Sequence, residues 1–429
     1  MKMVIKTCLL PGGPPIRHHL YRGMYTISSA AEGCVPMMAG KLRDDQLPPE
    51  LAVTTASLRD VDELLSLYFL IYGNTYPIAL GTDREVMSSI IGGGNDLWLI
   101  ARDIRCNRIA GSVVVQIDRQ EGIGKLEALV SHPEYRRKGI AKTLIKSATE
   151  RALSGEAPLN SVYTTTRTVS LDPQLIFLDA GYIPLGIFPN AHKLKVYETV
   201  TLMARYRTGI LDRRIPVGGI SNKIASLWHT MNGHIGFSFV PGILPAERFK
   251  APGSAVEFEI IEAQHFVARK FREHRRTPRN SFYPFHAPNV LFVSADGTVE
   301  LFAHLSRKDR YCTLISMNVS FRSLRHKMGS LLELLKEHNA EYIETLLPLA
   351  DHTSIAALLD DDFLPCAIYP AMREIDGALH DYIIMSRTMV PLDLRGMRIA
   401  APFKSYIDQY VDLWKQMHID TLEVFDETR

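Results

Sequence analysis

The sequence has few cysteines and no pattern that would join them or use them to hold a metal. Its five cysteines are Cys8, Cys34, Cys106, Cys312 and Cys366. Their number is odd, they are widely scattered, and no C-x-x-C pair or zinc-ligand spacing occurs. This argues against a disulfide framework and against a zinc site, so we expect no metal and a reducing compartment, the cytoplasm.

The sequence also lacks an apolar run that could be exported or cross a membrane. The apolar stretch 4–10 is broken by Lys6 and ends in a Gly/Pro cluster, too short for the core of a signal peptide. The longest stretch without Asp, Glu, Lys or Arg, 224–246, contains two histidines, two prolines and three glycines. Such a segment would leave backbone groups unpaired in lipid, so we expect no membrane span and interpret it as a connector.

An excess of one charge sign is absent as well. Lys plus Arg number 49 and Asp plus Glu number 47, a net charge of +2, which provides no overall field to attract nucleic acid. The basic cluster between Arg269 and Arg279 is interpreted as a solvated helix face or loop. With 46% hydrophobic and 22% charged residues the composition is that of folded globular proteins, and 429 residues predict two or three domains.

The order of predicted elements divides the chain. Residues 1–50 are rich in Gly and Pro and predict an extension; residues 51–208 predict one domain in the order β-α-α-β-β-β-α-β-α-β-β. Residues 209–255 predict a connector and residues 256–429 a second domain that ends in a helix. The predicted fold class is α/β (α+β), with two domains, each a mostly antiparallel mixed sheet flanked by helices.

The loop Arg136-x-x-Gly139-x-Ala141 lies between a predicted strand and a predicted helix from about Ile140 to Leu153. A helix start offers unpaired N–H donors and the positive end of a dipole, and Gly139 with the small Ala141 lets the backbone approach a phosphate closely. Walker and dinucleotide-binding motifs are absent. The loop therefore predicts a binding site for a phosphorylated cofactor of another kind.

The segment 129–141, LVSHPEYRRKGIA, closely resembles the acetyl-CoA motif R/Q-x-x-G-x-G/A of the GNAT N-acyltransferase superfamily, and the element order of 51–206 resembles that family too. The resemblance implies that acetyl-CoA, or another acyl-CoA, is the co-substrate. It also implies that the strand before the loop accepts the pantetheine and the loop amides hold the diphosphate. The cofactor-binding residues implied by the resemblance are Leu129, Val130, Ser131, Arg136, Arg137, Lys138, Gly139, Ile140, Ala141, Ser170 and Phe177.

The predicted catalytic base is Glu127, on the strand that leads into the motif, where members of the family often carry an acting carboxylate. Burial among apolar neighbours would make it a stronger base for the amine proton. The alternative is a carboxylate that faces solvent or pairs near Lys125.

The catalytic acid is missing from its usual place. In many members of the family the downstream helix reads N-x-x-A-x-x-x-Y-x-x-x-G-F. Here Ser170, Pro173 and Phe177 replace the Asn, the Ala and the Tyr that acts as the general acid. Phe177 has no proton to give, so either water or another group, such as Tyr163, protonates the thiolate, or the domain binds acyl-CoA without efficient transfer.

The second half is predicted to be a degenerate repeat of the first. Strands are expected at 256–261, 289–294, 298–306 and 312–321, a helix at 327–339 and a strand at 342–348. Residues 351–363 then repeat the helix signature of 170–182. The connection 321–326 contains no glycine, so we expect this copy to bind no CoA and the plan to be a tandem with one working domain. Asp360 to Asp362 are interpreted as a solvated turn, and 405–419 as a helix docked on the body.

The sequence thus predicts an N-acyltransferase that moves an acyl group, most simply acetyl, from CoA to an amine of a small molecule or peptide. No nucleic acid or membrane partner is expected, and a homo-oligomer is compatible with the sequence. The alternatives are a non-catalytic acyl-CoA sensor or scaffold and a decarboxylase or transferase that acts on another acyl group.

Overall fold

The computed structural model describes residues 50–73, 79–193, 196–245, 256–274, 284 and 286–419. Apart from residue 50, the predicted N-terminal extension lies outside the described residues, as do Cys8, Cys34 and the end of the basic cluster beyond His274. Among the described residues no helix has both the length and the apolar character needed to cross a membrane.

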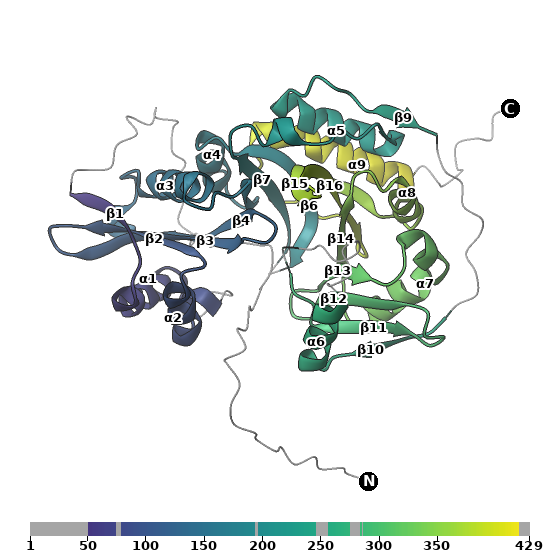
Figure 1. The fold of residues 1–429 in the computed structure, drawn as a ribbon, viewed down its shortest axis with the longest axis horizontal. Coiled ribbons are helices and arrows are strands. Elements are labelled where there is room, and N and C mark those ends of the chain that lie inside the picture. The colour runs from purple at the N-terminus through teal and green to yellow at the C-terminus, as the bar shows by residue number, and fades with distance from the viewer. Residues whose placement is uncertain are drawn as a thin grey trace, which may run out of the picture.

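The first half, residues 51–206, contains the elements that the sequence predicts, in the predicted order. They are β1 (Leu51–Thr55), α1 (Val61–Tyr72), α2 (Arg84–Gly93), β2 (Leu97–Asp103), β3 (Arg108–Asp118), β4 (Ile123–Ser131), α3 (Ile140–Ser154), β5 (Ser161–Arg167), α4 (Asp172–Asp179), β6 (Ile183–Lys193) and β7 (Tyr197–Tyr206). Helices α1 and α2 cover one face of the sheet and α3 and α4 the other (Figure 1).

The predicted connector is a folded part of the body. It contains β8 (Gly219–Ser221), α5 (Asn222–Ile235) and β9 (Gly242–Leu244); its last ten residues, 246–255, lie outside the described residues. Ile224, Leu227, Trp228 and Met231 of α5 are buried in the main core. Their i, i+3, i+4, i+7 spacing is that of a helix with one apolar face, so the predicted connector contains a helix packed into the core, which the sequence analysis did not identify.

The second half, residues 258–418, contains β10 (Phe258–Ile261), α6 (Gln264–His274), β11 (Val290–Ser294), β12 (Glu300–Ser306), β13 (Tyr311–Met317), α7 (Phe321–Glu337), β14 (Tyr342–Pro348), α8 (His352–Asp360), β15 (Leu364–Ile375), β16 (Ala378–Thr388) and α9 (Lys404–His418). The predicted connection 321–326 is the beginning of α7. Ser320 caps that helix, because its Oγ accepts the N–H of Ser323 at 3.2 Å, and the strand therefore ends at Met317 rather than at Phe321.

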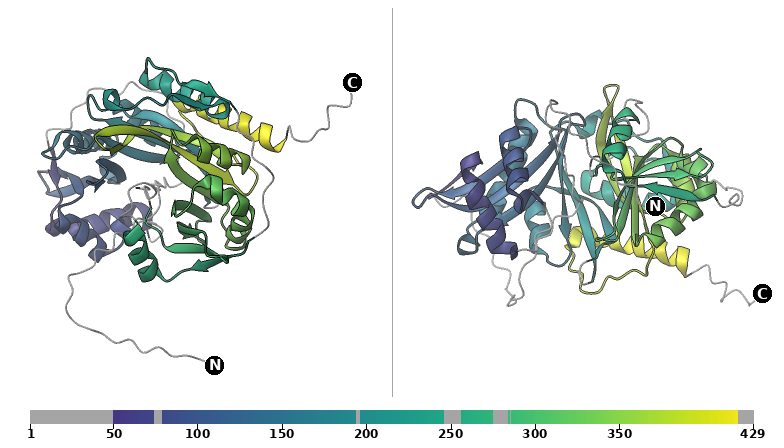
Figure 2. Two further views of the ribbon diagram at one scale, coloured as in Figure 1. Left: turned by 45° about the vertical axis from the view of Figure 1, so that its right-hand side comes forward. Right: turned by 90° about the horizontal axis from the view of Figure 1, so that it is seen from below.

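All strands except β8 and β9 form one 14-stranded sheet in the order β1-β2-β3-β4-β5-β7-β6-β15-β16-β14-β13-β12-β11-β10. The prediction of a mixed, mostly antiparallel sheet is confirmed, but the two halves share one sheet instead of having one each. Read from either edge towards the middle, the order is the same: four antiparallel strands, a parallel neighbour and then an antiparallel pair. Figure 2 shows the two halves on either side of the middle of this sheet, where β6 and β15 are neighbours.

The halves meet where β6 pairs with β15, at Gly186 opposite Ala367. A Cβ atom on Gly186 would collide with Ala367 and with the carbonyl of Cys366, so only glycine allows this approach. The two strands carry similar sequences, IPLGIFP and LPCAIYP, and each has a register shift just before the crossing residue. Helix α9 packs across the junction against α5, β6 and β15, as expected for a docked helix.

Candidate active site

Strand β4 opens away from β5 at a β-bulge. Ala128 has φ 53°, and the pairing with β3 shifts register between Glu127 opposite Val114 and Val130 opposite Ser112. Tyr68 of α1 holds the bulge, because its hydroxyl donates to the carbonyl of Ala128 at 2.7 Å. Burial raises the pKa of Tyr68, which keeps this donor protonated.

The parallel pairing of β4 with β5 extends only over Ile123 to Lys125 opposite Ser161 to Tyr163. One further contact follows, in which Thr164 Oγ1 donates to the carbonyl of Leu126 at 2.9 Å. Beyond this point the two strands separate, and backbone groups of β4 face a cavity instead of a partner strand.

The loop after β4 is held in a shape that leads directly into α3. His132 Nδ1 accepts the N–H of Glu134 at 3.2 Å, and burial and the neighbouring Arg108 lower the pKa of His132. Gly139 is the N-cap of α3 with φ 76°, and a Cβ atom there would meet nothing within 4 Å. Because glycine has no side chain to cap the helix, the first N–H groups of α3 remain available to a ligand.

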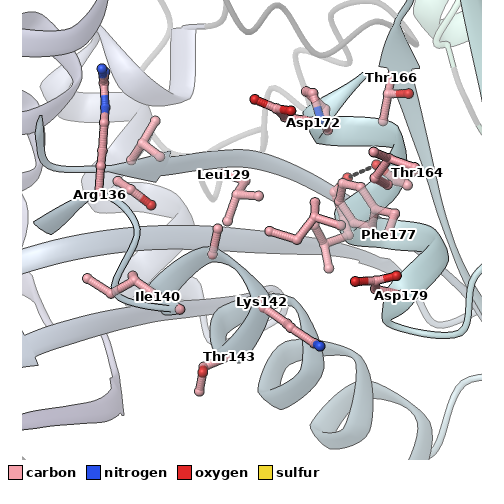
Figure 3. Close-up of a pocket in the computed structure, with 18 of the residues that line it drawn as sticks. Leu129, Arg136, Ile140, Lys142, Thr143, Thr164, Thr166, Asp172, Phe177 and Asp179 are labelled. Carbon is pink, nitrogen blue, oxygen red and sulfur yellow. Dashed lines mark hydrogen bonds between the residues drawn. The ribbon is translucent and has the colours of Figure 1, made fainter. Parts of the chain in front are cut away.

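A cavity of about 800 Å³ lies between the separated strands, the loop and α4 (Figure 3). Except for Ser170, every predicted site residue lines it: Glu127, Leu129, Val130, Ser131, Arg136, Arg137, Lys138, Gly139, Ile140, Ala141 and Phe177. Arg136 lies at one end and Phe177 towards the other. The cavity therefore joins a basic, amide-rich mouth to an apolar interior.

Ser170 does not reach the cavity lining. Its hydroxyl accepts the N–H of Asp172 at 3.4 Å at the start of α4, and its carbonyl accepts a hydrogen bond from Gln174 at 3.0 Å. These contacts stabilise the helix start, and nothing in this geometry brings the Ser170 side chain to a ligand in the cavity.

Basic side chains surround the mouth of the cavity. Arg136, Arg137 and Lys138 line it, and in the part of the chain that the structure describes neither arginine forms an ion pair. The Lys138 ammonium lies 4.8 Å from the centre of the Tyr135 ring, while the Tyr135 hydroxyl donates to Asp103 at 3.0 Å. Positive charge beside open amides is the arrangement that binds a diphosphate.

Glu127 lies on the cavity wall and also forms an ion pair. Its side chain is 2% exposed, and Lys125 Nζ lies 2.6 Å from its Oε2. Two residues apart on one strand, the two side chains point to the same face. Glu127 does not face solvent and pairs with Lys125, as the alternative expected, while its role as a base stays a prediction.

Phe177 and Tyr163 provide no proton at this site. Phe177 lines the cavity and packs edge to face on Tyr182, with ring centres 5.1 Å apart, while the Tyr182 hydroxyl is shared with Thr149 at 2.7 Å. Tyr163 packs edge to face on Tyr369, 6.3 Å away, and is a core residue outside the cavity lining. Protonation of a leaving thiolate by water stays a prediction; the ordinary pKa of a thiol, near 8.5, makes such a step undemanding.

The β5 side of the cavity, which was not predicted from the sequence, is formed by Thr164, Thr165, Thr166 and Arg167. Arg167 makes a buried two-pronged ion pair with Glu198 of β7. The run of threonines next to a charged residue within a predicted strand could have indicated a cavity wall. These side chains line a cavity only because β4 opens away from β5, which sequence periodicity does not reveal.

A comparison with protein-family models decides the class of this site. The model described as the acetyltransferase (GNAT) family matches residues 60–169, which include the bulge, the loop and the start of α3. Residues 60–169 form a GNAT acetyltransferase domain. The predicted enzyme class, a GNAT-type acetyltransferase, is confirmed, and acetyl-CoA is the donor that enzymes of this class use.

Solved structures similar to part of this chain include two acetyltransferases. An acetyltransferase of the GNAT family from Streptococcus pneumoniae has 22% sequence identity and a TM-score of 0.33, over 37% of this chain and 99% of its own. Spermidine N-acetyltransferase from Vibrio cholerae in complex with CoA and spermine has 15% identity and a TM-score of 0.33, over 38% and 98%. No curated protein matches the chain.

Outside the GNAT domain, the Asp360–Asp362 turn at the end of α8 is paired with arginines rather than simply solvated. Arg325 lies 3.3 Å from Asp360, and Arg387 lies 3.2 Å from Asp362. Asp361 is partly buried, and burial raises its pKa to about 6 although the charges of both arginines lower it. No group of three or more metal-ligating His, Cys, Asp or Glu side chains occurs among the described residues.

Replacing Asp361 by asparagine is expected to stabilise the protein at neutral pH but not at pH 4. Burial raises the folded-state pKa of Asp361 from 3.8 to about 6. The ionised carboxylate therefore destabilises the fold fully above about pH 6, and this destabilisation disappears below about pH 4, where Asp361 is protonated in both states. After discounting for solvent, Asp361→Asn should gain about 1 kcal/mol at pH 7.5. Urea unfolding at both pH values measures this, and an equal gain at pH 4 would contradict the assignment.

Proposed function

We propose that this GNAT acetyltransferase moves the acetyl group of acetyl-CoA to an amine of a small molecule or peptide. The observation that carries the proposal is the opening of β4 from β5 directly above the uncapped start of α3 at Gly139. This arrangement offers amides and positive charge to a diphosphate and an apolar channel to the pantetheine.

In the proposed reaction Glu127 accepts the proton of the acceptor ammonium, directly or through a water. The free amine nitrogen forms a bond to the thioester carbon, and a backbone amide of β4 beyond the bulge donates to the developing oxyanion. The C–S bond then breaks as the carbonyl re-forms, the acylated nitrogen loses its second proton to water, and water delivers a proton to the departing thiolate. The position of Glu127 on the cavity wall supports this role, and Lys125 beside it compensates the charge of the carboxylate.

We further propose that residues 256–429 are a degenerate GNAT-like repeat without a CoA site. Its support is the shared strand order and two matching details. Strand β13 has a register shift opposite Phe302 and Ala303, as β4 has opposite Ser112 and Val114, and Thr345 Oγ1 donates to the carbonyl of Leu314 at 3.0 Å, as Thr164 does to Leu126.

The connection from β13 to α7 is the feature that would abolish CoA binding in this repeat. It contains only Asn318, Val319 and Ser320, so it is much shorter than the loop between β4 and α3 and has no glycine. The Ser320 hydroxyl accepts the N–H of Ser323, which occupies an amide that a phosphate would need. The repeat then serves as a packing partner and as a wall of the acceptor site.

The test of this function is CoA release from acetyl-CoA with a panel of amines, comprising polyamines, amino sugars, amino acids and lysine-containing peptides. We expect at least one acceptor to raise thiol release well above the rate with water, with the product heavier by one acetyl group. Binding of acetyl-CoA without release for any acceptor would instead support an acyl-CoA sensor.

A further inference from the structure

The segment that follows β16 returns from the second half to the first. This C-terminal strap, residues 389–400, leaves β16 at Thr388 and ends where α9 is about to begin. The N–H of Arg398 donates to the carbonyl of Thr168 at 2.6 Å. The strap thus contacts the link between β5 and α4, which belongs to the GNAT domain.

Gln174 of α4 is the main side chain that binds the strap. It is 0% exposed, and its Oε1 accepts the N–H of Ala400 at 2.8 Å. Its Nε2 donates to the carbonyl of Arg398 at 2.8 Å and to that of Ser170 at 3.0 Å. Both donors and the acceptor of this amide are therefore used, and two of the three bonds cross from one half of the chain to the other.

The residues around Gln174 form one wall of the cavity. Pro173 and Leu175, its direct neighbours, line the cavity, as do Val169 and Phe177 on either side. Gln174 itself points away from the cavity, towards the strap. A buried amide with three hydrogen bonds fixes the rotation and position of α4, and with them the apolar wall that a pantetheine would contact.

We propose that Gln174 is a positioning residue for CoA binding, which locks the β5–α4 wall of the cavity onto the C-terminal strap and makes donor affinity depend on the second half of the chain. The inference rests on the proposed function, because it takes the cavity to be the CoA site. A wall that contacts the donor equally in the ground state and in the transition state affects KM and Kd more than kcat.

The chain offers a matched control in Asn190 of β6. Asn190 is also a buried amide that binds the strap: its Nδ2 donates to the carbonyl of Pro391 at 3.0 Å, and its Oδ1 accepts the N–H of Asp393 at 3.0 Å. It does not line the cavity. Its φ of 57° suits glycine, so Asn190→Gly removes the anchor without backbone strain.

The experiment measures Kd for CoA, KM and kcat with acetyl-CoA, and Tm for the full chain and three variants. Gln174→Met removes all three hydrogen bonds of the amide. Ala400→Pro removes one of them from the strap side, at a backbone φ of −69° that proline adopts. Asn190→Gly is the control.

We expect Gln174→Met and Ala400→Pro to raise the Kd for CoA and the KM for acetyl-CoA at least fivefold with kcat within twofold of wild type. Asn190→Gly should lower Tm but leave Kd unchanged. Wild-type Kd in a folded Gln174→Met or Ala400→Pro protein, or an equal loss in Asn190→Gly, would overturn the inference. Failure of the wild-type chain itself to bind CoA would instead refute the proposed function.

Discussion

Replacing Gly139 by valine is expected to weaken CoA binding at least tenfold, a loss of about 1.4 kcal/mol. At φ 76° a β-branched residue is strained, and its side chain would occupy the space between the first amides of α3 and the diphosphate. Calorimetric titration with CoA measures the change. Since a Cβ atom at this position meets no protein atom within 4 Å, the variant should remain folded.

Gly209 provides the control for backbone strain. It has φ 79° and equally open surroundings, but it does not line the cavity. Gly209→Val should therefore cost similar stability and leave CoA affinity unchanged. If folded Gly139→Val binds CoA as tightly as wild type, the assignment of the loop is wrong.

Replacing Glu127 by glutamine is expected to lower turnover roughly a hundredfold while CoA affinity stays the same. The amide has the size of the carboxylate but cannot accept the amine proton, and a positioned base typically contributes about 10² to 10⁴ in rate. The measurement is kcat with an acceptor found in the amine panel, beside CoA titration of the same protein.

The control variant Glu121→Gln shows whether breaking any buried ion pair lowers turnover. Glu121 is 5% exposed and pairs with Arg373 at 3.0 Å, outside the cavity lining. Glu121→Gln should keep wild-type turnover. Wild-type turnover in Glu127→Gln, or equal losses of turnover in both variants, would show that Glu127 is not the base and only pairs with Lys125.

The elements of the fold were largely predictable because their residues repeat with the period of a strand or a helix. Helix α5 was not identified, although Ile224, Leu227 and Trp228 have helical spacing, because the histidines, prolines and glycines of this stretch were weighed only against a membrane span. The predicted strand 312–321 runs past the true end at Met317, although Ser320 is a typical N-cap residue that marks the start of α7.

The candidate site could be predicted where its residues lie close together in the sequence, as in the loop from Arg136 to Ala141. It could not be predicted where it is formed by strands that are distant in the sequence. The pairing of β6 with β15, the β5 wall and the bonds of Gln174 to Arg398 and Ala400 join residues far apart in the chain. Neither periodicity nor composition indicates which edges of two repeats will meet.

We propose that the chain has one CoA site, formed by β4, the loop at Gly139 and α3, and that the shortened β13–α7 connection provides none. Calorimetric titration of CoA into the full-length protein tests it most directly. We expect saturation at one CoA per chain; saturation at two, or no binding at all, would show that this assignment is wrong.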